Sequence, residues 1–367
     1  MLSSEDYPSV EYEDIISNSG ELNKDIRSKQ IRKSGILFDN NDVLYGKLRP
    51  YLHNWLNPDF KGVAVGDWWV MQPKKIDKNF LYRLIQTKKF DDVANQSSGS
   101  KMPRADWNLV SNSSFMLPSI VKEQAKIAEL FTSLDRLITL HQRKYDKLVN
   151  IKKAMLEKMF PKDGAKVPEI RFKGFTDDWE QRKLGEYLIV SNEKNTDGIY
   201  GREDVLSVSG ALGIVNQIEF KGRSFAGVSV SNYGVVENGD VVYTKSPLNN
   251  NPYGIIKANK GQTGIVSTLY AVYHPGEGTD SNFVQTYFEQ NSRMNNYMHP
   301  LVNKGAKNDM KVSSENALKG YVIFPNSKEQ KIIYDFFARL DRLITLHQRK
   351  LEKLQNLKQA CLEKLFV

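Results

Sequence analysis

The chain has 367 residues and a formal charge of +9, with 40% apolar and 11% aromatic residues. This composition is typical of a folded protein, and the single cysteine, Cys361, excludes an intramolecular disulfide and a cysteine-based metal cluster. The N-terminus has no basic start followed by an apolar run, and no stretch approaches about eighteen apolar residues. We therefore expect no signal peptide, no membrane span and a reducing cytoplasm as the setting.

Residues 1–117 form the first block, which we expect to be a mixed α/β domain. Runs of β-branched and aromatic residues bounded by Gly, Asn, Asp and Pro indicate strands within 35–48 and 61–73. A short helix is expected over 79–93. Trp68 and Trp69 lie in a strand-like run and are expected in the core.

A long helix is expected in the next segment, 118–161. Neither Pro nor Gly interrupts 123–160, Pro118 precedes a candidate cap at Ser119, and Pro161 follows the last helical residue. About 38 residues at 1.5 Å each span roughly 57 Å. Apolar residues recur every three or four positions, which is typical of a coiled-coil seam. The expected seam of this helix comprises Leu130, Leu134, Leu137, His141, Leu148, Ile151, Met155 and Met159.

The remaining chain repeats this order of elements. A linker at 162–170 leads into a second mixed block at 171–323, with strands expected within 238–247 and 263–275 and a short helix over 281–297. A second long helix follows in 324–367, entered at Pro325 and Ser327. Its expected seam comprises Leu340, Leu343, His347, Leu354, Leu357, Cys361 and Leu365.

The two long helices are copies of one another. Residues 134–144 and 340–350 both read LDRLITLHQRK, at an offset of 206, which also aligns Glu123-Gln124 with Glu329-Gln330. Upstream, DVLYGK at 42–47 matches DVVYTK at 240–245 at an offset of 198. The chain is therefore an internal duplication in which a variable block precedes a repeated helix.

These elements predict an α+β fold with a pseudo-two-fold repeat. We expect two mixed α/β domains separated by two long helices, which pair as an antiparallel coiled coil and hold the domains at opposite ends. The alternative is that each helix packs only on its own block. The segments 120–160 and 327–367 carry +4 each, and the rest of the chain carries +1. This surplus favours a polyanionic partner over a merely basic soluble protein.

Several motifs resemble the specificity subunit of Type I restriction–modification systems. RFKGFTDDWEQRKLGE at 171–186 is similar to the entry of a recognition domain in that family, and NDVLYGKLRP at 41–50 and GDVVYTK at 239–245 are similar to its central strand and loop. The run from Phe324-Pro325 through Glu329-Gln330 to Leu340-Asp341 is similar to the exit into its spacer helix. Pro118, Glu123-Gln124 and Leu134-Asp135 repeat that exit, so the resemblance covers nearly the whole chain.

The resemblance implies a division of labour between this chain and its partners. Each variable block would be a target recognition domain that reads one half of a bipartite, asymmetric site in double-stranded DNA. The spacer helices, 118–161 and 324–367, would fix the gap and dock two modification (methyltransferase) subunits, to which restriction (motor and nuclease) subunits are added. S-adenosylmethionine, ATP and Mg are expected on those partners, and no cofactor is expected here. One departure is that the segment 168–198 has no counterpart before Met1, so the first domain is expected to be shortened.

The candidate DNA contacts are basic, amide and aromatic residues in loops after strands. Lys47 and Lys245 recur at matched positions, as do Lys101 and Lys307, so these lysines are the main candidates for phosphate contacts. Asn249 and Asn250 could read adenine edges. Each could instead be a solvated loop residue. The full set is Lys47, Arg49, Tyr51, Lys101 and Arg104 in the first domain, and Lys245, Asn249, Asn250, Lys304, Lys307 and Lys311 in the second.

Motifs for catalysis are missing from the sequence. Neither GxGxxG nor GxxxxGK[ST] occurs, and Asn251-Pro252-Tyr253 lacks the second proline of a methyltransferase motif, so it is interpreted as a turn. His141 and His347 are interpreted as seam residues and not as metal ligands, and Cys361 as a small core residue. We expect a non-catalytic subunit; the alternatives are a coiled-coil protein-binding scaffold without DNA readout and a fused enzyme that both recognises and methylates DNA.

Overall fold

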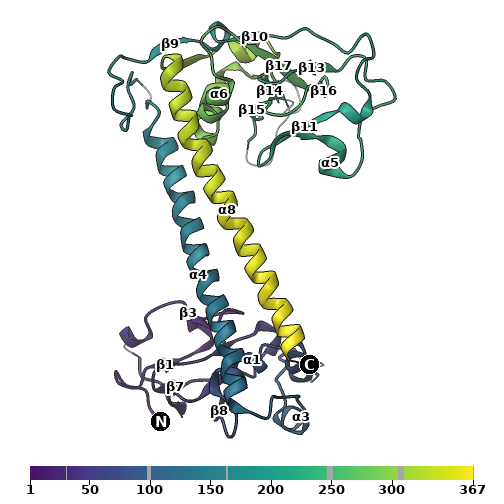
Figure 1. Cartoon of the computed structure of the whole chain (residues 1–367). Coiled ribbons are helices and arrows are strands. Elements are labelled where there is room, and N and C mark those ends of the chain that lie inside the picture. The colour runs from purple at the N-terminus through teal and green to yellow at the C-terminus, as the bar shows by residue number, and fades with distance from the viewer. Residues whose placement is uncertain (30, 97–100, 163, 246–250, 305–309, 367) are drawn as a thin grey trace. The chain divides into compact units, whose positions relative to one another are not determined.

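The computed structural model describes residues 1–29, 31–96, 101–162, 164–245, 251–304 and 310–366 (Figure 1). The chain divides into two compact units. The first unit comprises Met1–Lys144 with His347–Val367, and the second comprises Tyr145–Leu346. Each unit therefore contains one variable block together with about half of each long helix.

The two long helices are α4, Val121–Lys158, and α8, Ser327–Leu365, and each is continuous (Figure 1). Within each unit the two helix segments run antiparallel, because residues with higher numbers on α4 contact residues with lower numbers on α8. The contacts are Phe131–Phe366, Asp135–Lys358 and His141–His347 in the first unit, and Lys152–Asp341 and Phe160–Phe337 in the second.

The apolar seam differs from the predicted one at two equivalent positions. Leu134 and Leu340 are buried as expected for a seam, but Leu137 and Leu343 are each 43% exposed. Their neighbours Ile138 and Ile344 take the half-buried positions. Leu137 and Ile138 are neighbours in the sequence, and both are apolar. The prediction placed residues 134, 137 and 141 on the packed face of the helix, whereas residues 134, 138 and 141 occupy it. Leu130, Leu357 and Leu365 also lie more exposed than predicted, whereas Leu148 and Leu354 are half-buried.

Among its described residues, the first unit contains three small sheets and three short α-helices around an aromatic core. Thr87 caps a new helix within the segment predicted as one helix, so 79–93 is divided between α1 (Lys78–Leu84) and α2 (Lys88–Ala94). Trp68 is buried, and Trp69 is half-buried and stacks on Tyr45. One sheet has the order β6-β5-β8 (Trp55–Leu56, Val43–Gly46, Trp68–Met71), one has the order β1-β7-β4 (Ser9–Val10, Gly62–Ala64, Ile36–Phe38), and β2 (Ile15–Ile16) pairs with β3 (Glu21–Leu22). The helices are α1 (Lys78–Leu84), α2 (Lys88–Ala94) and α3 (Trp107–Asn112).

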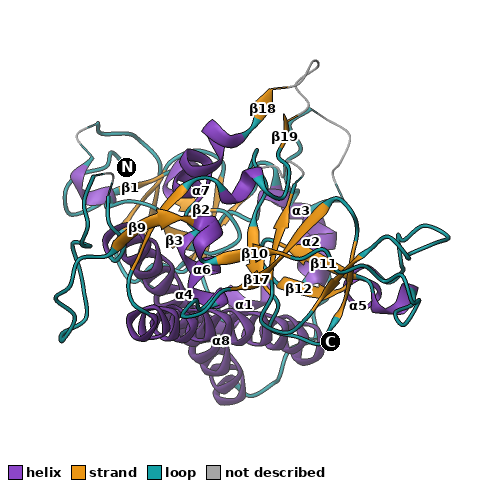
Figure 2. Cartoon of the chain, turned by 90° about the horizontal axis from the view of Figure 1, so that it is seen from above, coloured by secondary structure: helices purple, strands orange, loops and turns teal. Residues whose placement is uncertain are grey.

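The second unit is also mixed α/β, and Figure 2 shows its strands and short helices coloured by secondary structure. Its main sheet has the order β10-β17-β14-β15 (Leu188–Val190, Tyr270–Pro275, Val241–Thr244, Ile256–Ala258). The paired strands are β9 with β20 (Glu180–Lys183, Tyr321–Phe324), β11 with β12 (Leu206–Ser209, Gly213–Asn216), β13 with β16 (Gly234–Val236, Gly264–Val266) and β18 with β19 (Asn303–Lys304, Met310–Lys311). The short helices are α5 (Gln217–Lys221), α6 (Ser281–Tyr287) and α7 (Asn291–Met298), so the segment predicted as one helix at 281–297 is again two.

A repeated glutamine ties each long helix to its own block. The Gln124 side-chain oxygen accepts from the backbone N–H of Asp77 at 2.9 Å, and its amide donates to the carbonyl of Pro118. Gln330 accepts from the N–H of Asp280 at the same distance and likewise donates to the preceding proline. Asp77 and Asp280 cap α1 and α6. The sequence repeat is therefore also a repeat of hydrogen bonds.

Over the described part of the chain, no helix has the length and apolar character needed to cross a membrane.

Candidate nucleic-acid interface

The loop after β5 brings together three of the predicted DNA contacts in the first unit. The Lys47 N–H donates to the carbonyl of Asp67 at 2.9 Å, and its carbonyl accepts from the N–H of Ala105 at 2.8 Å. The Arg49 N–H donates to the carbonyl of Pro103 at 2.7 Å. These bonds hold residues 47–49 against 103–105, so Lys47, Arg49 and Arg104 come from neighbouring backbone positions.

The backbone after this loop turns sharply and exposes an aromatic ring. Arg49 has a φ of 50°, in the left-handed region, and begins a 3-10 turn at Pro50–Leu52. The turn leaves Tyr51 53% exposed, and Arg49 and Lys101 are also exposed. An exposed ring beside cations is suited to contacts with a sugar–phosphate backbone or a base.

Asp67 is a partner of this cluster that the sequence did not indicate. Its carboxylate lies 3.8 Å from the Lys47 ammonium and 3.0 Å from the Arg104 guanidinium. One carboxylate thus faces two cations, which leaves net positive charge at the loop. The Tyr12 hydroxyl links the backbone of Asp67 to that of Leu48. It donates to the Asp67 carbonyl and accepts from the Leu48 N–H at 3.1 Å. Burial raises the pKa of Tyr12 to about 12, so its hydroxyl keeps the proton that it donates.

Lys245 occupies the equivalent place in the second unit, directly after β14. Its N–H donates to the carbonyl of Leu269 at 3.3 Å, as Lys47 does to that of Asp67. Burial lowers the pKa of Lys245, and the nearby ammonium of Lys194 lowers it further, against the pull of Glu315. The charge of Lys194 therefore acts on the Lys245 side chain at the end of strand β14. Lys194 was not among the predicted contacts.

The other predicted contacts of the second unit cannot all be placed. Asn249, Asn250 and Lys307 lie outside the described residues. Lys304 and Lys311 belong to the antiparallel pair β18–β19, with Lys304 opposite Met310 and Asn303 opposite Lys311.

A basic and aromatic segment at the end of α5 and in the residues after it is a further candidate that the prediction missed. The Lys221 ammonium lies 4.5 Å from the ring centre of Phe220, and the Arg223 guanidinium lies 4.7 Å from that of Phe225. Both rings are exposed, at 38% and 58%. In the sequence, this candidate is indicated by basic and aromatic residues that lie close together in EFKGRSF at 219–225.

The histidines and the Asn-Pro-Tyr sequence can be placed among the described residues. No group of three or more His, Cys, Asp or Glu side chains that could hold a metal ion occurs among them. His141 and His347 face one another as a pair. The Gly254 N–H donates to the carbonyl of Asn251 at 3.0 Å, which makes the Asn-Pro-Tyr sequence a turn.

Residues 2–150 match the family model of the Type I restriction modification DNA specificity domain. The matched part of the chain therefore carries a Type I DNA specificity domain. This domain is one of DNA sequence recognition, and the matched residues include β5 and the loop that follows it.

Two solved structures match nearly the whole chain, and the second of them has a similar fold. One is the HsdS subunit from Thermoanaerobacter tengcongensis, with 19% sequence identity over 98% of this chain and 90% of that chain and a TM-score of 0.48. The other is the Type-I restriction-modification system S subunit from M. genitalium, with 13% identity over 98% of this chain and 88% of that chain and a TM-score of 0.57.

Proposed function

We propose that this specificity subunit gives its complex a bipartite, asymmetric target in double-stranded DNA and is itself non-catalytic. The observation that carries the proposal is that the two units share equivalent strands and long helices but differ in the residues of the loops around them. Lys47 and Lys245 follow equivalent strands, with equivalent backbone hydrogen bonds. The first unit adds Arg49, Tyr51 and Arg104, whereas the second adds Lys194 and, elsewhere on its block, the basic and aromatic segment 217–225.

This division matches the two kinds of contact that DNA recognition needs. Contacts to phosphates carry no sequence information, so they can recur in both domains, and Lys47 and Lys245 suit that role. Contacts to base edges must differ between unlike half-sites, and the surrounding loops do differ. The first recognition domain would be residues 1–117 and the second 171–323.

The modification subunits would dock on the repeated surface of the long helices. Leu137 and Leu140 are 43% and 46% exposed, and their equivalents Leu343 and Leu346 are 43% and 44% exposed. Leucines exposed at the same positions of both helices form two like patches. Two like patches suit two copies of one partner.

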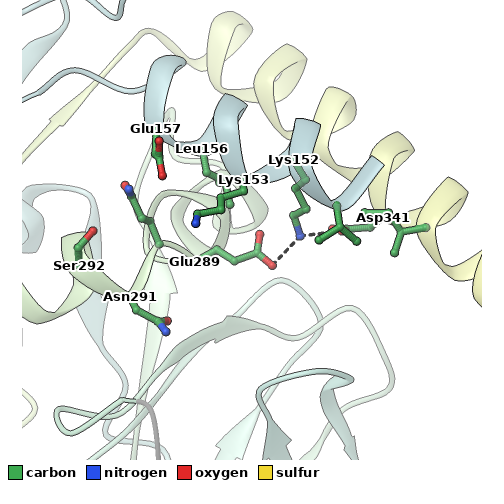
Figure 3. Close-up of a pocket in the computed structure, with 11 residues that line it drawn as sticks. Lys152, Lys153, Leu156, Glu157, Glu289, Asn291, Ser292 and Asp341 are labelled. Carbon is green, nitrogen blue, oxygen red and sulfur yellow. Dashed lines mark hydrogen bonds and ion pairs between the residues drawn. The ribbon is translucent and has the colours of Figure 1, made fainter. Parts of the chain in front are cut away.

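A pocket occurs at equivalent places in the two units and extends the proposed docking surface. In the second unit it has a volume of about 570 Å³, and Lys152 lies at its wall between Glu289 and Asp341 (Figure 3). In the first unit the volume is about 630 Å³. Shared lining positions are Lys152, Leu156, Asp341 and Ile344 in the second unit, and Lys358, Leu362, Asp135 and Ile138 in the first.

The partners would supply the remaining functions of the complex. Restriction subunits would join the complex of DNA, specificity subunit and modification subunits, and S-adenosylmethionine, ATP and Mg would bind to these partners in the cytoplasm. The lengths of α4 and α8 would set the gap between half-sites, because a helix rises by about 1.5 Å per residue. A change of spacer length should therefore change the spacing of the recognised site.

The deciding experiment is co-expression with the modification subunit of the same system, followed by mapping of methylated adenines by single-molecule sequencing. A split motif with two unlike half-sites and a fixed gap is the expected result. A stable complex that methylates no defined motif would overturn the proposal and favour a protein-binding scaffold. Methylation by this chain alone would favour a fused enzyme.

The docking surface is tested by the number of modification subunits bound, measured by native mass spectrometry. Leu137→Glu and Leu343→Glu should each remove one of two bound copies, and the double variant should bind none. Lys88→Glu, at an exposed site on α2, is the control that keeps both copies. Two copies retained by the double variant would exclude these leucines from the interface.

A further inference from the structure

An arm of the second unit, residues 206–228, presents large apolar side chains to solvent. The arm comprises the hairpin of β11 and β12, the helix α5 and the residues after it, and α5 lies at the periphery of the unit in both views (Figure 1, Figure 2). Phe220 is 38% and Phe225 58% exposed. Leu212, at the turn of the hairpin, is 62% exposed, and Val228 is fully exposed. Exposed apolar side chains gathered on one element are typical of a contact surface.

The backbone that carries the rings is held by side-chain hydrogen bonds. The Gln217 side-chain oxygen accepts from the N–H of Phe225 at 2.6 Å, and its amide donates to the Ser207 hydroxyl at 3.1 Å. The Arg202 guanidinium donates to the carbonyl of Ala226 at 3.0 Å. The segment after α5 is thereby tied to β11 and to the 3-10 turn before it. A ligand that binds the rings does not have to order this segment, which lowers the entropic cost of binding.

A cation lies over each of the two rings. The Lys221 ammonium is 4.5 Å from the ring centre of Phe220, the Arg223 guanidinium is 4.7 Å from that of Phe225, and both cations are exposed. Glu219 is the one acidic residue in the sequence of the arm. An apolar protein surface that covered the rings would also desolvate the two cations, which is unfavourable without anions to pair them. DNA offers stacked bases to the rings and phosphates to the cations in the same ligand.

We propose that Phe225 enters the base stack of duplex DNA, with Lys221 and Arg223 on the adjacent phosphates. The inference rests on the proposed function, because it requires that the second unit binds DNA. Phe225 is more exposed than Phe220, and Gln217 holds its backbone N–H, so Phe225 is the ring that enters. Insertion of an apolar side chain unstacks one base step, and the additional contacts that the opened step permits offset that cost.

The test uses the complex with its modification subunit and a duplex that carries the methylated motif and its flanks. Adenines of both strands are replaced one at a time by 2-aminopurine, whose fluorescence rises when it leaves the base stack. We expect a rise at one step that contains no methylated adenine, and Phe225→Ala should abolish it. A rise at a methylated adenine belongs to the modification subunit, which extrudes its target base, and should remain in the variant.

Affinity for a weakened step is the second readout. A mismatch at the responding step lowers the cost of unstacking, so it should raise the affinity of the unaltered complex about fivefold and that of Phe225→Ala by less than about twofold. The double variant Lys221→Ala, Arg223→Ala should keep the gain from the mismatch. It should reduce the slope of log K against log salt by about 2, because two phosphate contacts are lost.

Tyr321→Ala is the matched control, because Tyr321 is an aromatic residue of the same unit that is 60% exposed and lies outside the arm. It should leave both readouts unchanged, and every variant should keep the far-UV circular dichroism and melting temperature of the unaltered chain.

A rise that survives Phe225→Ala, or a variant that loses modification subunits in native mass spectrometry and keeps both DNA readouts, would overturn the inference. A complex that methylates a defined motif without any such rise overturns the inference alone. A complex that binds no duplex overturns the proposed function together with it.

Discussion

The Nδ1 atoms of His141 and His347 lie 2.7 Å apart, although the two residues are 206 positions apart and occupy the same place in the repeated helix. At this distance one nitrogen donates and the other accepts, so both cannot carry a proton on Nδ1. Burial lowers the pKa of both histidines, and the lysines Lys144 and Lys350 lower it further.

The pair predicts that the helix contact weakens in mild acid. A histidine whose folded-state pKa lies below its ordinary value near 6.5 adds stability above about pH 6.5, which is lost as the pH falls toward the folded-state pKa. The melting temperature should therefore decrease between pH 7.5 and 5.5. The double variant His141→Gln, His347→Gln should show a clearly smaller decrease, and an identical decrease would remove the pair as its cause.

Glu329 and Glu123 form a matched pair for a stability test. Glu329→Gln removes the charge that satisfies the Arg171 guanidinium in a buried site, and should lower the free energy of unfolding by about 3 kcal/mol. Glu123→Gln changes an exposed side chain and should change it by less than about 0.5 kcal/mol. Urea unfolding of each variant measures both values, and equal losses would contradict the assigned environments.

The ion pairs between the long helices should differ in strength. Lys152 lies 2.8 Å from Glu289 and 2.6 Å from Asp341. Its burial opposes the charge, but the two carboxylates outweigh that effect and raise the pKa of Lys152. Lys152→Met would leave the two carboxylates facing one another, so we expect a loss of about 1–3 kcal/mol at pH 7.

The equivalent substitution in the first unit is the control for this prediction. Lys358→Met leaves Asp135 with a second partner, because the Arg83 guanidinium lies 2.7 Å from it. The loss should therefore be smaller than that of Lys152→Met in urea unfolding. A larger loss for Lys358→Met would show that Arg83 does not compensate.

The cluster around Asp67 predicts opposite effects on DNA affinity. Asp67→Asn removes the carboxylate that faces Lys47 and Arg104, and should strengthen binding to duplex DNA. Lys47→Ala should weaken it and reduce the slope of log K against log salt by about 1. Anisotropy titrations of the complex with its modification subunit at several salt concentrations measure both, with Lys88→Ala as the control. Weaker binding by Asp67→Asn would assign Asp67 a positioning role.

The sequence alone was sufficient for the repeated frame and the long helices. Identical LDRLITLHQRK segments, uninterrupted helix formers and bounding prolines depend only on local residue patterns. The same patterns placed Lys47 and Lys245 after equivalent strands, where the structure has them. Local pattern could not choose between Leu137 and Ile138, because both are apolar and both fit a spacing of three or four.

Only the tertiary structure decided which charges meet and which are buried. Glu123 and Glu329 are the same residue in the same motif, yet one is exposed and the other is buried against Arg171, a residue 158 positions away. Asp67 likewise reaches Arg104 across 37 positions. Helix periodicity is a property of neighbouring residues, whereas the environment of a charge depends on segments that the fold brings from elsewhere in the chain.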